Sequence, residues 1–259
     1  MLAHQRQATI LEMVKRDGGV RVSNLVQEFG VSDMTIRRDL ETLEERGLVA
    51  KVHGGATPIE SHATDEPGYA AKSTRQQAEK EAIARRAADL VHPGATVALS
   101  AGTTTATLAR YLTQIPALTV VTNSIPAADA LHRSDRTDQT VVLTGGQRTP
   151  SDALVGPVAT TAISSLHTDL VFLGVHGIDE RAGLTTPNLM EAEINRALIN
   201  ASRRLIVLAD HTKWQTVGIS TIAPLDRADI VISDDGLPAD AREVLTAHVG
   251  ELYLAGAST

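Results

Sequence analysis

Residues 22–56 read VSNLVQEFGVSDMTIRRDLETLEERGLVAKVHGGA. Here Leu25 and Phe29 share one helical face, and Gly30 follows at a position where a left-handed residue ends a helix at little cost. Ser32 is a good N-cap for a second helix, because its hydroxyl can accept a hydrogen bond from one of the first free amides. The stretch therefore predicts two short helices joined by a glycine turn.

The second predicted helix has an apolar side and a basic side. Ile36 and Leu40 recur at helical spacing and face a small core, which directs Thr35, Arg37 and Arg38 elsewhere. A helix in the major groove reads base edges with residues near its N-terminal end, and arginine can donate two hydrogen bonds to guanine. Taken alone, an arginine pair is more often a solvated surface. The surrounding helix-turn-helix pattern favours DNA reading instead.

A small hairpin is predicted after the second helix. Leu48 to Gly55 alternate as a short ribbon would, and this alternation lets Lys51 and His53 reach a phosphate or the minor groove. Two helices followed by such a ribbon are the layout of a winged helix-turn-helix. We expect this DNA-binding domain to span residues 1–56.

The net charge of −7 falls on one part of the chain. Residues 1–56 carry eight basic and eight acidic residues, while residues 57–259 carry 16 basic and 23 acidic ones. A neutral reading head attracts phosphates weakly, so tight binding predicts two heads on one operator and a dimer or tetramer of the chain. The missing basic surplus excludes a nucleoid protein that coats DNA without sequence preference.

Composition also restricts the compartment and the metal chemistry. The chain has no cysteine, which excludes disulfides and thiolate metal sites and suits a reducing cytosol. No apolar run approaches 18 residues and no signal-like stretch opens the chain, so we expect a cytoplasmic protein without a membrane partner. The nine histidines are scattered, and we expect neither a metal ion nor a cofactor.

A second domain is expected over residues 76–259, after a linker over residues 57–75 that is rich in proline, glycine and acidic residues. In it, short aliphatic runs alternate with helical stretches. The runs are 96–100, 118–122, 140–144, 170–174, 204–209, 230–233 and 252–254. Because they are apolar throughout, they predict strands covered on both faces, in an open and mainly parallel α/β sheet.

Polar residues gather where these runs end, and ligands of such sheets lie beyond the carboxyl ends of the strands. Gly102 and the three threonines after it open a helix, so that free amides and hydroxyls converge where a phosphate would fit. Simple helix capping explains these residues equally well. Lys213, placed after another run, adds the point charge that a phosphate oxygen prefers.

Motifs in both halves make the chain resemble the DeoR family of bacterial transcriptional regulators. In the first half they are Val31-Ser32, Thr35 to Leu40, Leu43-Glu44, Gly47-Leu48 and Val52 to Ala56. In the second half they are Gly102 to Thr105, Thr122 to Ser124, Gly145-Gly146, Val155 to Pro157, Gly183 to Thr186, Glu191, and Ala209-Asp210 with Lys213. The resemblance implies a winged helix-turn-helix joined to a sensor domain for phosphorylated sugars or related metabolites. That sensor domain is similar in fold to ribose-5-phosphate isomerase and CoA-transferase domains.

The resemblance and the residue patterns together give the candidate sites. The predicted DNA-binding residues are Ser32, Thr35, Arg37, Arg38, Lys51 and His53. The predicted effector-binding residues are Ser100, Gly102, Thr103, Thr104, Thr105, Asn123, Ser124, Gly145, Arg148, His176, Glu191, Asp210 and Lys213.

We therefore expect a DNA-binding regulator, more specifically a repressor of a carbohydrate-utilisation operon. Its partners would be a double-stranded DNA operator, a phosphorylated sugar effector and further copies of itself. The alternative is a sugar-phosphate isomerase or transferase-like enzyme with an appended DNA-binding head, because Glu191, Asp210 and Lys213 are residue types that can move a proton next to a carbonyl. Sequence order does not establish that geometry, and a DNA head has no use for turnover, so we expect no enzyme.

Overall fold

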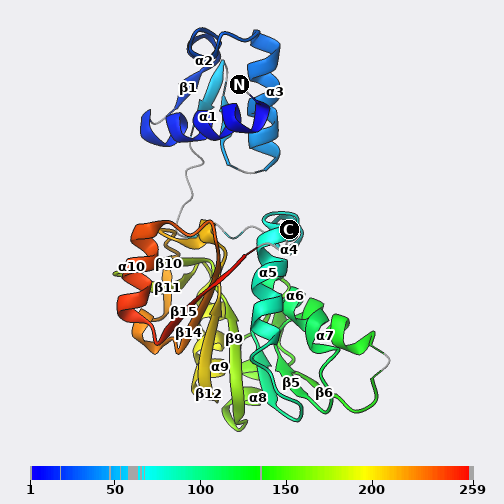
Figure 1. Ribbon diagram of the computed structural model, residues 1–259. Coiled ribbons are helices and arrows are strands. Elements are labelled where there is room, and N and C mark those ends of the chain that lie inside the picture. Colours follow the sequence, from blue (N-terminus) through cyan, green and yellow to red (C-terminus); the bar gives the residue numbers. More distant parts are fainter. Residues whose placement is uncertain are drawn as a thin grey trace. The chain divides into compact units, whose positions relative to one another are not determined.

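The chain forms two compact units in a computed structural model that describes residues 2–17, 19–46, 48–52, 54–57, 64, 66, 68–134 and 136–256 (Figure 1). The first unit is Met1–Ser61 and the second is His62–Thr259.

The first unit is a winged helix-turn-helix, which confirms the predicted fold. Its described elements are α1 (Ala3–Asp17), β1 (Val20–Arg21), α2 (Val22–Phe29), α3 (Asp33–Glu45), β2 (Ala50–Val52) and β3 (Gly55–Thr57). The strands form an antiparallel sheet of order β1-β3-β2, in which β2 and β3 make the wing.

A small aliphatic core holds these elements together. Ile10 and Val14 of α1, Leu25 of α2, and Ile36 and Leu40 of α3 lie in one cluster and are almost fully buried. Burying one such side chain contributes about 1.5–3 kcal/mol. Helix α1, for which the sequence analysis made no prediction, supplies one wall of this core.

Two glycines are required by the backbone of the first unit. Gly30 ends α2 with φ 63°, and its amide donates to the carbonyl of Val26. At Gly55, an added Cβ would lie 2.0 Å from the carbonyl oxygen of Val20, so β1 can pair with β3 only across a glycine.

The second unit is an α/β unit. Its helices are α4 (Tyr69–Ser73), α5 (Gln77–Ala88), α6 (Thr103–Leu112), α7 (Ile125–His132), α8 (Pro157–Ser164), α9 (Leu189–Asn200) and α10 (Ala239–His248), with 3-10 turns η1 (His211–Lys213) and η2 (Leu225–Arg227). Its main strands are β4 (Thr96–Leu99), β5 (Thr119–Thr122), β6 (Thr140–Leu143), β9 (Thr168–Gly174), β12 (Ser202–Leu208), β14 (Ile230–Asp234) and β15 (Glu251–Ala255). Shorter strands are β7 (Gln147–Arg148), β8 (Leu154–Val155), β10 (Gly177–Asp179), β11 (Gly183–Thr186) and β13 (Ser220–Ala223).

The main strands form one parallel sheet of order β15-β14-β12-β9-β4-β5-β6. Each predicted aliphatic run corresponds to one of them, and the predicted open parallel sheet is confirmed. The chain runs outward from β4 to β6, returns to β9 beside β4, and then runs outward to β15. The strand order therefore reverses between β4 and β9. In doubly wound sheets, the ligand crevice lies outside the carboxyl ends of the strands at this switch point.

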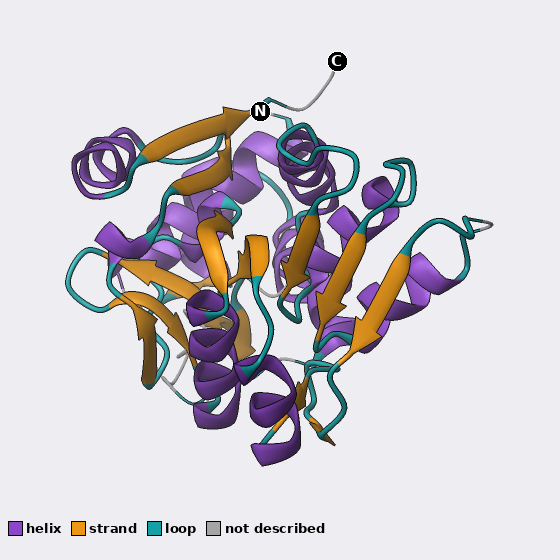
Figure 2. Cartoon of the chain, turned by 90° about the horizontal axis from the view of Figure 1, so that it is seen from below, coloured by secondary structure: helices purple, strands orange, loops and turns teal. Residues whose placement is uncertain are grey.

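Helices cover both faces of the sheet (Figure 2). On one face α5, α6 and α7 bury an aliphatic cluster that includes Ile83, Leu108 and Phe172. On the other face α8, α9 and α10 bury a second cluster that includes Ile163 and Leu198. The two short sheets, β10-β11-β13 and β7-β8, were not predicted, because strands such as β7 (QR) and β11 (GLTT) are not apolar runs.

The stretch expected as a linker, residues 57–75, contains helix α4, which belongs to the second unit. The amide of Tyr69 donates to the carbonyl of Pro150 at 3.0 Å, so this helix is attached to the α/β unit. Among the described residues, no helix has the length and apolarity needed to cross a membrane.

Candidate functional site

The buried side of α3 fixes the direction of its polar side. Ile36 and Leu40 hold the helix on the core, and Ser32 caps it by accepting a hydrogen bond from the amide of Thr35 at 3.2 Å. The hydroxyls of Ser32 and Thr35 also lie 2.9 Å apart. These two predicted DNA-binding residues therefore stand together at the N-terminus of α3, the end of a helix that attracts phosphate.

Arg37 and Arg38 both extend from α3 into solvent, but their surroundings differ. Arg37 Nε donates to Asp33 Oδ1 one turn earlier at 2.5 Å, and this hydrogen bond raises the pKa of Arg37. The guanidinium of Arg38 has no ion pair with any described residue. Arg38 can therefore meet a base edge directly, whereas Arg37 has to give up Asp33 first.

Lys51 lies on strand β2 of the wing and is tied to α3. Its Nζ donates to Glu41 Oε1 at 3.1 Å, and its amide donates to Glu44 Oε1 at 3.2 Å. A surface ion pair of this kind contributes about 0–1 kcal/mol, so it does not prevent Lys51 from turning to a phosphate. His53, the other predicted wing residue, lies outside the described residues.

Two features of α3 were missed by the sequence analysis. Met34 is 71% exposed near the N-terminus of α3, where an apolar side chain can contact the methyl group of thymine. Asp39 is buried, and its Oδ2 accepts a hydrogen bond from Arg6 Nε of α1 at 2.6 Å. In the sequence, this pair is indicated by Asp39 itself, an acidic residue three positions after Ile36 on the apolar side of the helix.

In the α/β unit, Ser100 joins the carboxyl ends of the two strands at the switch point. The amide of Gly174, at the end of β9, donates to Ser100 Oγ at 2.9 Å. Ser100 is 0% exposed, so this residue lies behind the surface that an effector could touch. Its short side chain is taken up by this backbone amide, which suits Ser100 to position the two strand ends.

Helix α6 begins at this switch point with an uncapped N-terminus. Gly102, at φ 154°, precedes the helix, and no side chain accepts a hydrogen bond from its first amides. Thr105 Oγ1 donates back to the carbonyl of Gly102 and Thr107 Oγ1 to that of Thr103, both at 3.0 Å. Thr103 is partly exposed, whereas Thr104 and Thr105 are buried. The first amides of α6 are thus available to an anion.

Asn123 and Ser124 follow β5 and are both fully buried. Asn123 Oδ1 accepts from the amide of Ala101 at 3.0 Å, and its Nδ2 donates to the carbonyl of Leu154 at 3.1 Å. Ser124 Oγ caps α7 by accepting from the amide of Ala127 at 3.3 Å. These two predicted effector residues therefore hold the backbone around the ends of β5 and α7 through their side-chain polar atoms.

Gly145 and Arg148 follow β6, the outermost strand on their side of the sheet. Gly145 turns the chain with φ 72°, and the guanidinium of Arg148 forms an ion pair with Asp152 at 2.6 Å. In the sheet, strand β5 separates β6 from β4.

Three further predicted residues follow β9 and β12, the strands beside the switch point. His176 follows β9, is partly exposed, and donates its amide to the carbonyl of Thr185 at 3.1 Å. Asp210 is buried at the end of β12 and accepts from the amide of Thr212 at 3.1 Å, which starts turn η1. Lys213, the last residue of η1, is partly exposed.

Two lysines that the sequence analysis did not single out lie near Lys213. Lys80 of α5 is buried and donates to the carbonyls of Lys72 and Arg75, each at 2.6 Å. Burial lowers the pKa of Lys80 to about 8. Repulsion from Lys213 and Lys72 lowers this pKa as well, while attraction by Asp210 raises it. Burial, together with repulsion from Lys213, also lowers the pKa of Lys72. Three ammonium groups that repel one another favour a bound anion.

Glu191 begins α9 as half of a carboxyl pair. Thr149 Oγ1 donates to Glu191 Oε1 at 2.7 Å, but burial and the neighbouring Glu66 raise the pKa of Glu191 to about 7. Burial would also raise the pKa of Glu66, but hydrogen bonds from Asn188, Glu191 and Ser151 outweigh it and lower that pKa. Near neutral pH, the proton of the pair therefore belongs to Glu191.

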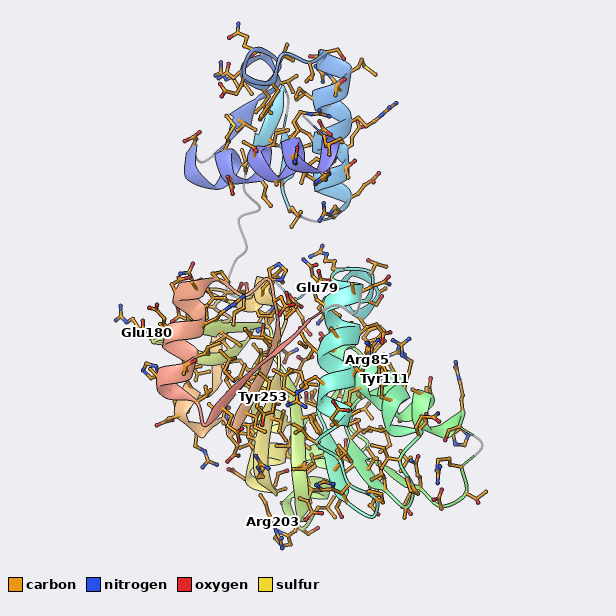
Figure 3. All side chains as sticks on the ribbon, viewed as in Figure 1. Glu79, Arg85, Tyr111, Glu180, Arg203 and Tyr253 are labelled. Carbon is orange, nitrogen blue, oxygen red and sulfur yellow. The ribbon has the colours of Figure 1, made fainter. Side chains whose placement is uncertain are left out.

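A cleft of about 520 Å³ opens beside the N-terminus of α6. Its polar lining includes Tyr69 of α4, Lys80 of α5, and Thr103 and Arg110 of α6, and Thr103 is the predicted effector residue among them. The side wall is firm because Tyr111 of α6 lies against α5 (Figure 3), where its hydroxyl donates to Glu81 Oε2 at 2.7 Å. The cleft suits a small polar molecule with an anionic group at the α6 end.

The part of the chain that the structure describes holds no group of three His, Cys, Asp or Glu side chains that could bind a metal ion.

Comparison with known families matches both units. The model described as "DeoR-like helix-turn-helix domain" matches residues 6–62, and the model described as "DeoR C terminal sensor domain" matches residues 75–235. Among solved structures, the chain resembles ribose 5-phosphate isomerase A from Methanocaldococcus jannaschii, with 17% identity, a TM-score of 0.38, and 52% of this chain and 53% of that one covered. It also resembles eIF2B beta from Chaetomium thermophilum, with 12% identity, a TM-score of 0.42, and 66% and 54% covered. The matches thus span about half the length of those solved chains and bear on neither ligand nor activity.

Curated relatives are similar over nearly the whole chain. A "Putative aga operon transcriptional repressor" from Escherichia coli is 34% identical over 97% of this chain and 94% of its own length. A "Glycerol-3-phosphate regulon repressor" from Escherichia coli is 34% identical over 96% and 98%, and the "HTH-type transcriptional regulator GlpR" of Haloferax volcanii is 37% identical over 94% of each chain. With a sensor-domain model matching more than half of its residues and relatives at this level of identity, the chain belongs to the DeoR family of transcriptional regulators.

Proposed function

We propose that this DeoR-family regulator represses a carbohydrate-utilisation operon, and that a phosphorylated sugar or related metabolite changes its affinity for the operator. One observation carries the proposal. The winged helix that exposes Arg38 is joined in one chain to a sheet whose switch point combines an uncapped helix N-terminus with three neighbouring lysines. The names of the relatives, which include repressors of an aga operon and of a glycerol-3-phosphate regulon, support both the repression and the ligand class.

In this proposal, the anionic group of the effector binds at the first amides of α6, with Lys213 supplying charge. The polar body of the effector occupies the cleft lined by Tyr69 and Arg110. His176, which follows β9 and is partly exposed, would contact the same molecule, whereas the buried Asp210 contributes by starting turn η1, which carries Lys213. Ser100 and Asn123 contribute by holding the backbone on which these groups stand.

The DNA-binding residues work through two copies of the chain. A neutral reading head attracts phosphates weakly, so two heads on one operator are needed for tight binding. If the effector prefers one arrangement of the dimer or tetramer by 5 to 150-fold, the linkage is worth about 1–3 kcal/mol at the operator. That is enough to switch a promoter.

The test is fluorescence anisotropy of the full-length protein on DNA from upstream of its own gene, with ribose 5-phosphate, fructose 1-phosphate, fructose 6-phosphate and glycerol 3-phosphate added in turn. At least one phosphosugar should change the operator affinity five-fold or more. Lys213→Ala should remove this response, while Arg133→Ala, a charge loss on the exposed end of α7, should keep it. Loss of operator binding in a folded Lys213→Ala protein would contradict the division of labour between the two units.

A catalytic alternative has one observation in its favour. A pKa of about 7 suits Glu191 to act as a general base toward a carbon acid. Assays for aldose–ketose isomerisation of the same phosphosugars, with the wild type and Glu191→Gln, test this alternative. Turnover that Glu191→Gln abolishes would favour the enzyme, and its absence in the wild type would favour the regulator.

A further inference from the structure

The start of the second unit lies against the turn before β8 and the start of α9. We call Glu66 and residues 68–75, which include α4, the strap. Glu66 Oε1 accepts from Ser151 Oγ and Glu66 Oε2 from Asn188 Nδ2, each at 2.9 Å. Lys72 Nζ donates to the same Ser151 Oγ at 2.7 Å. Glu66 is therefore fastened to the turn before β8 and to the start of α9, and Lys72 is fastened to the same turn.

The fastenings of the strap are polar. Helix α4 has five residues, none of which is fully buried, and a helix of that length is not stable by itself. Its C-terminal end is held by Lys80, whose ammonium donates to the carbonyls of Lys72 and Arg75. The closed position of the strap thus depends on a few hydrogen bonds and charges, without an apolar core of its own.

The closed strap also brings like charges together. Lys80 Nζ of the body lies 2.6 Å from the carbonyl oxygen of Lys72 on the strap. The charge of Lys213 repels both Lys72 and Lys80, while Glu191 and Glu66 attract Lys72. Repulsion among the three ammonium groups opposes closure. An anion placed between them would turn this repulsion into attraction.

We propose that the strap is the part of the sensor unit that responds to the effector, and that Lys72 of the strap binds the effector. An anionic group held between Lys72 on the strap and Lys213 on the body locks the strap in its closed position. A ligand that contacts both parts binds the closed state more tightly than the open state and must shift the population toward it. This inference rests on the proposed function, because it takes the phosphosugar as the locking anion.

The strap is placed where such locking matters for DNA binding. In the chain it follows the DNA-binding unit and precedes α5, so it is the first helical segment of the sensor unit. Closing or releasing the strap changes the position in the chain at which the sensor unit begins to be held in place after the winged helix-turn-helix. The effector then acts on the operator through this attachment, with no need for a change within the sheet.

Hydrogen exchange of the full-length protein followed by mass spectrometry tests the inference, with inorganic phosphate and the four phosphosugars as probes. The active phosphosugar should slow exchange of the amides over Tyr69–Ser73 by tenfold or more. Lys72→Met should weaken phosphosugar binding by tenfold or more and remove this protection. Arg75→Met is the matched control, because it removes one positive charge from an exposed side chain of the same strap and should leave both effects intact.

The outcomes separate the two proposals. If Lys213→Ala abolishes phosphosugar binding while Lys72→Met binds with wild-type affinity and the strap exchanges at an unchanged rate, the strap inference is wrong and the proposed function stands. If no phosphosugar and no phosphate affects the wild type, the proposed function fails and the inference with it.

A folding defect in Lys72→Met is recognised by faster exchange throughout the sheet. In that case Ser151→Ala, which removes the hydroxyl that holds both Lys72 and Glu66, gives the second test. An unchanged dependence of strap exchange on phosphosugar in a folded Ser151→Ala protein would overturn the inference.

Discussion

Arg6 Nε of α1 lies 2.6 Å from Asp39 Oδ2 of α3, and both side chains are at least nine-tenths buried. Gln7 Nε2 donates to the other carboxylate oxygen of Asp39 at 3.0 Å. The helix that reads DNA is therefore joined to α1 by a buried charge pair. Such a pair adds little stability by itself but fixes how its two helices meet.

Removing one member of this pair should be costly. Asp39→Ala leaves the buried Arg6 guanidinium without its partner, and we expect a loss of about 3–5 kcal/mol in the unfolding free energy of the first unit. The combined change Arg6→Met with Asp39→Leu should lose far less, because no uncompensated charge remains. Hydrogen exchange of the α1 amides measures both. Equal losses in the single and the double variant would contradict this account.

The two arginines of α3 should contribute unequally to operator binding. Arg38→Ala should weaken binding by about 1–3 kcal/mol and relax the base preference, since no described residue forms an ion pair with its guanidinium. Arg37→Ala should cost less, because the free protein already pairs Arg37 with Asp33 at 2.5 Å. Fluorescence anisotropy titrations with operator DNA and with scrambled DNA measure the affinity and the base preference of the two variants. The order would be contradicted if Arg37→Ala lost more specificity than Arg38→Ala.

The second unit should become less stable as the pH rises from about 4.5 to about 7. The pKa of Glu191 is raised from 4.5 to about 7 in the folded state. The stabilisation that Glu191 contributes to the free energy of unfolding is therefore complete below pH 4.5 and is lost between about pH 4.5 and 7. The lowered pKa of Glu66 acts below this window. The expected fall in unfolding free energy is at most about 3 kcal/mol.

Urea unfolding followed by the fluorescence of Trp214, the chain's one tryptophan, reports on this unit. Glu191→Gln stays neutral at every pH and should flatten the dependence between pH 5 and 7. A variant with the same slope as the wild type would show that the titrating group is a different one.

The sequence patterns located elements whose chemistry is continuous along the chain. The aliphatic runs located the seven parallel strands, because inner strands buried on both faces are apolar along most of their length. The edge strands β6 and β15 are apolar runs as well, although most of their residues are exposed or partly exposed. The second helix of the DNA-binding unit was also predicted, because Ile36 and Leu40 separate its buried side from Arg37 and Arg38. Helix α1 was missed although Ile10 and Val14 follow helical spacing, since no glycine turn or cap drew attention to it.

The candidate site was predicted in position but not in the direction of its side chains. Ser100 and Asn123 do follow strands at the rim, yet each is consumed by backbone groups that neighbouring strands bring within reach. That pairing depends on sheet register, which local sequence does not give. Lys80 could have been suspected, because it precedes Ile83 on the buried face of α5 by one turn. Glu66 could not, since its partners are more than 80 positions away in the chain.

Asn123 provides the sharpest test of whether the rim is held by its buried side chains. Asn123→Ala leaves the Ala101 amide and the Leu154 carbonyl without their partners in the interior, and each such group costs about 1–3 kcal/mol. We therefore expect the second unit to lose about 2–5 kcal/mol in urea unfolding, together with weaker phosphosugar binding, since Ala101 immediately precedes the Gly102 cap of α6. Ser124→Ala is the matched control: it removes an ordinary helix cap on the next residue and should cost about 1 kcal/mol. Phosphosugar affinity that survives in a folded Asn123→Ala protein would mean that the α6 N-terminus keeps its place without this side chain.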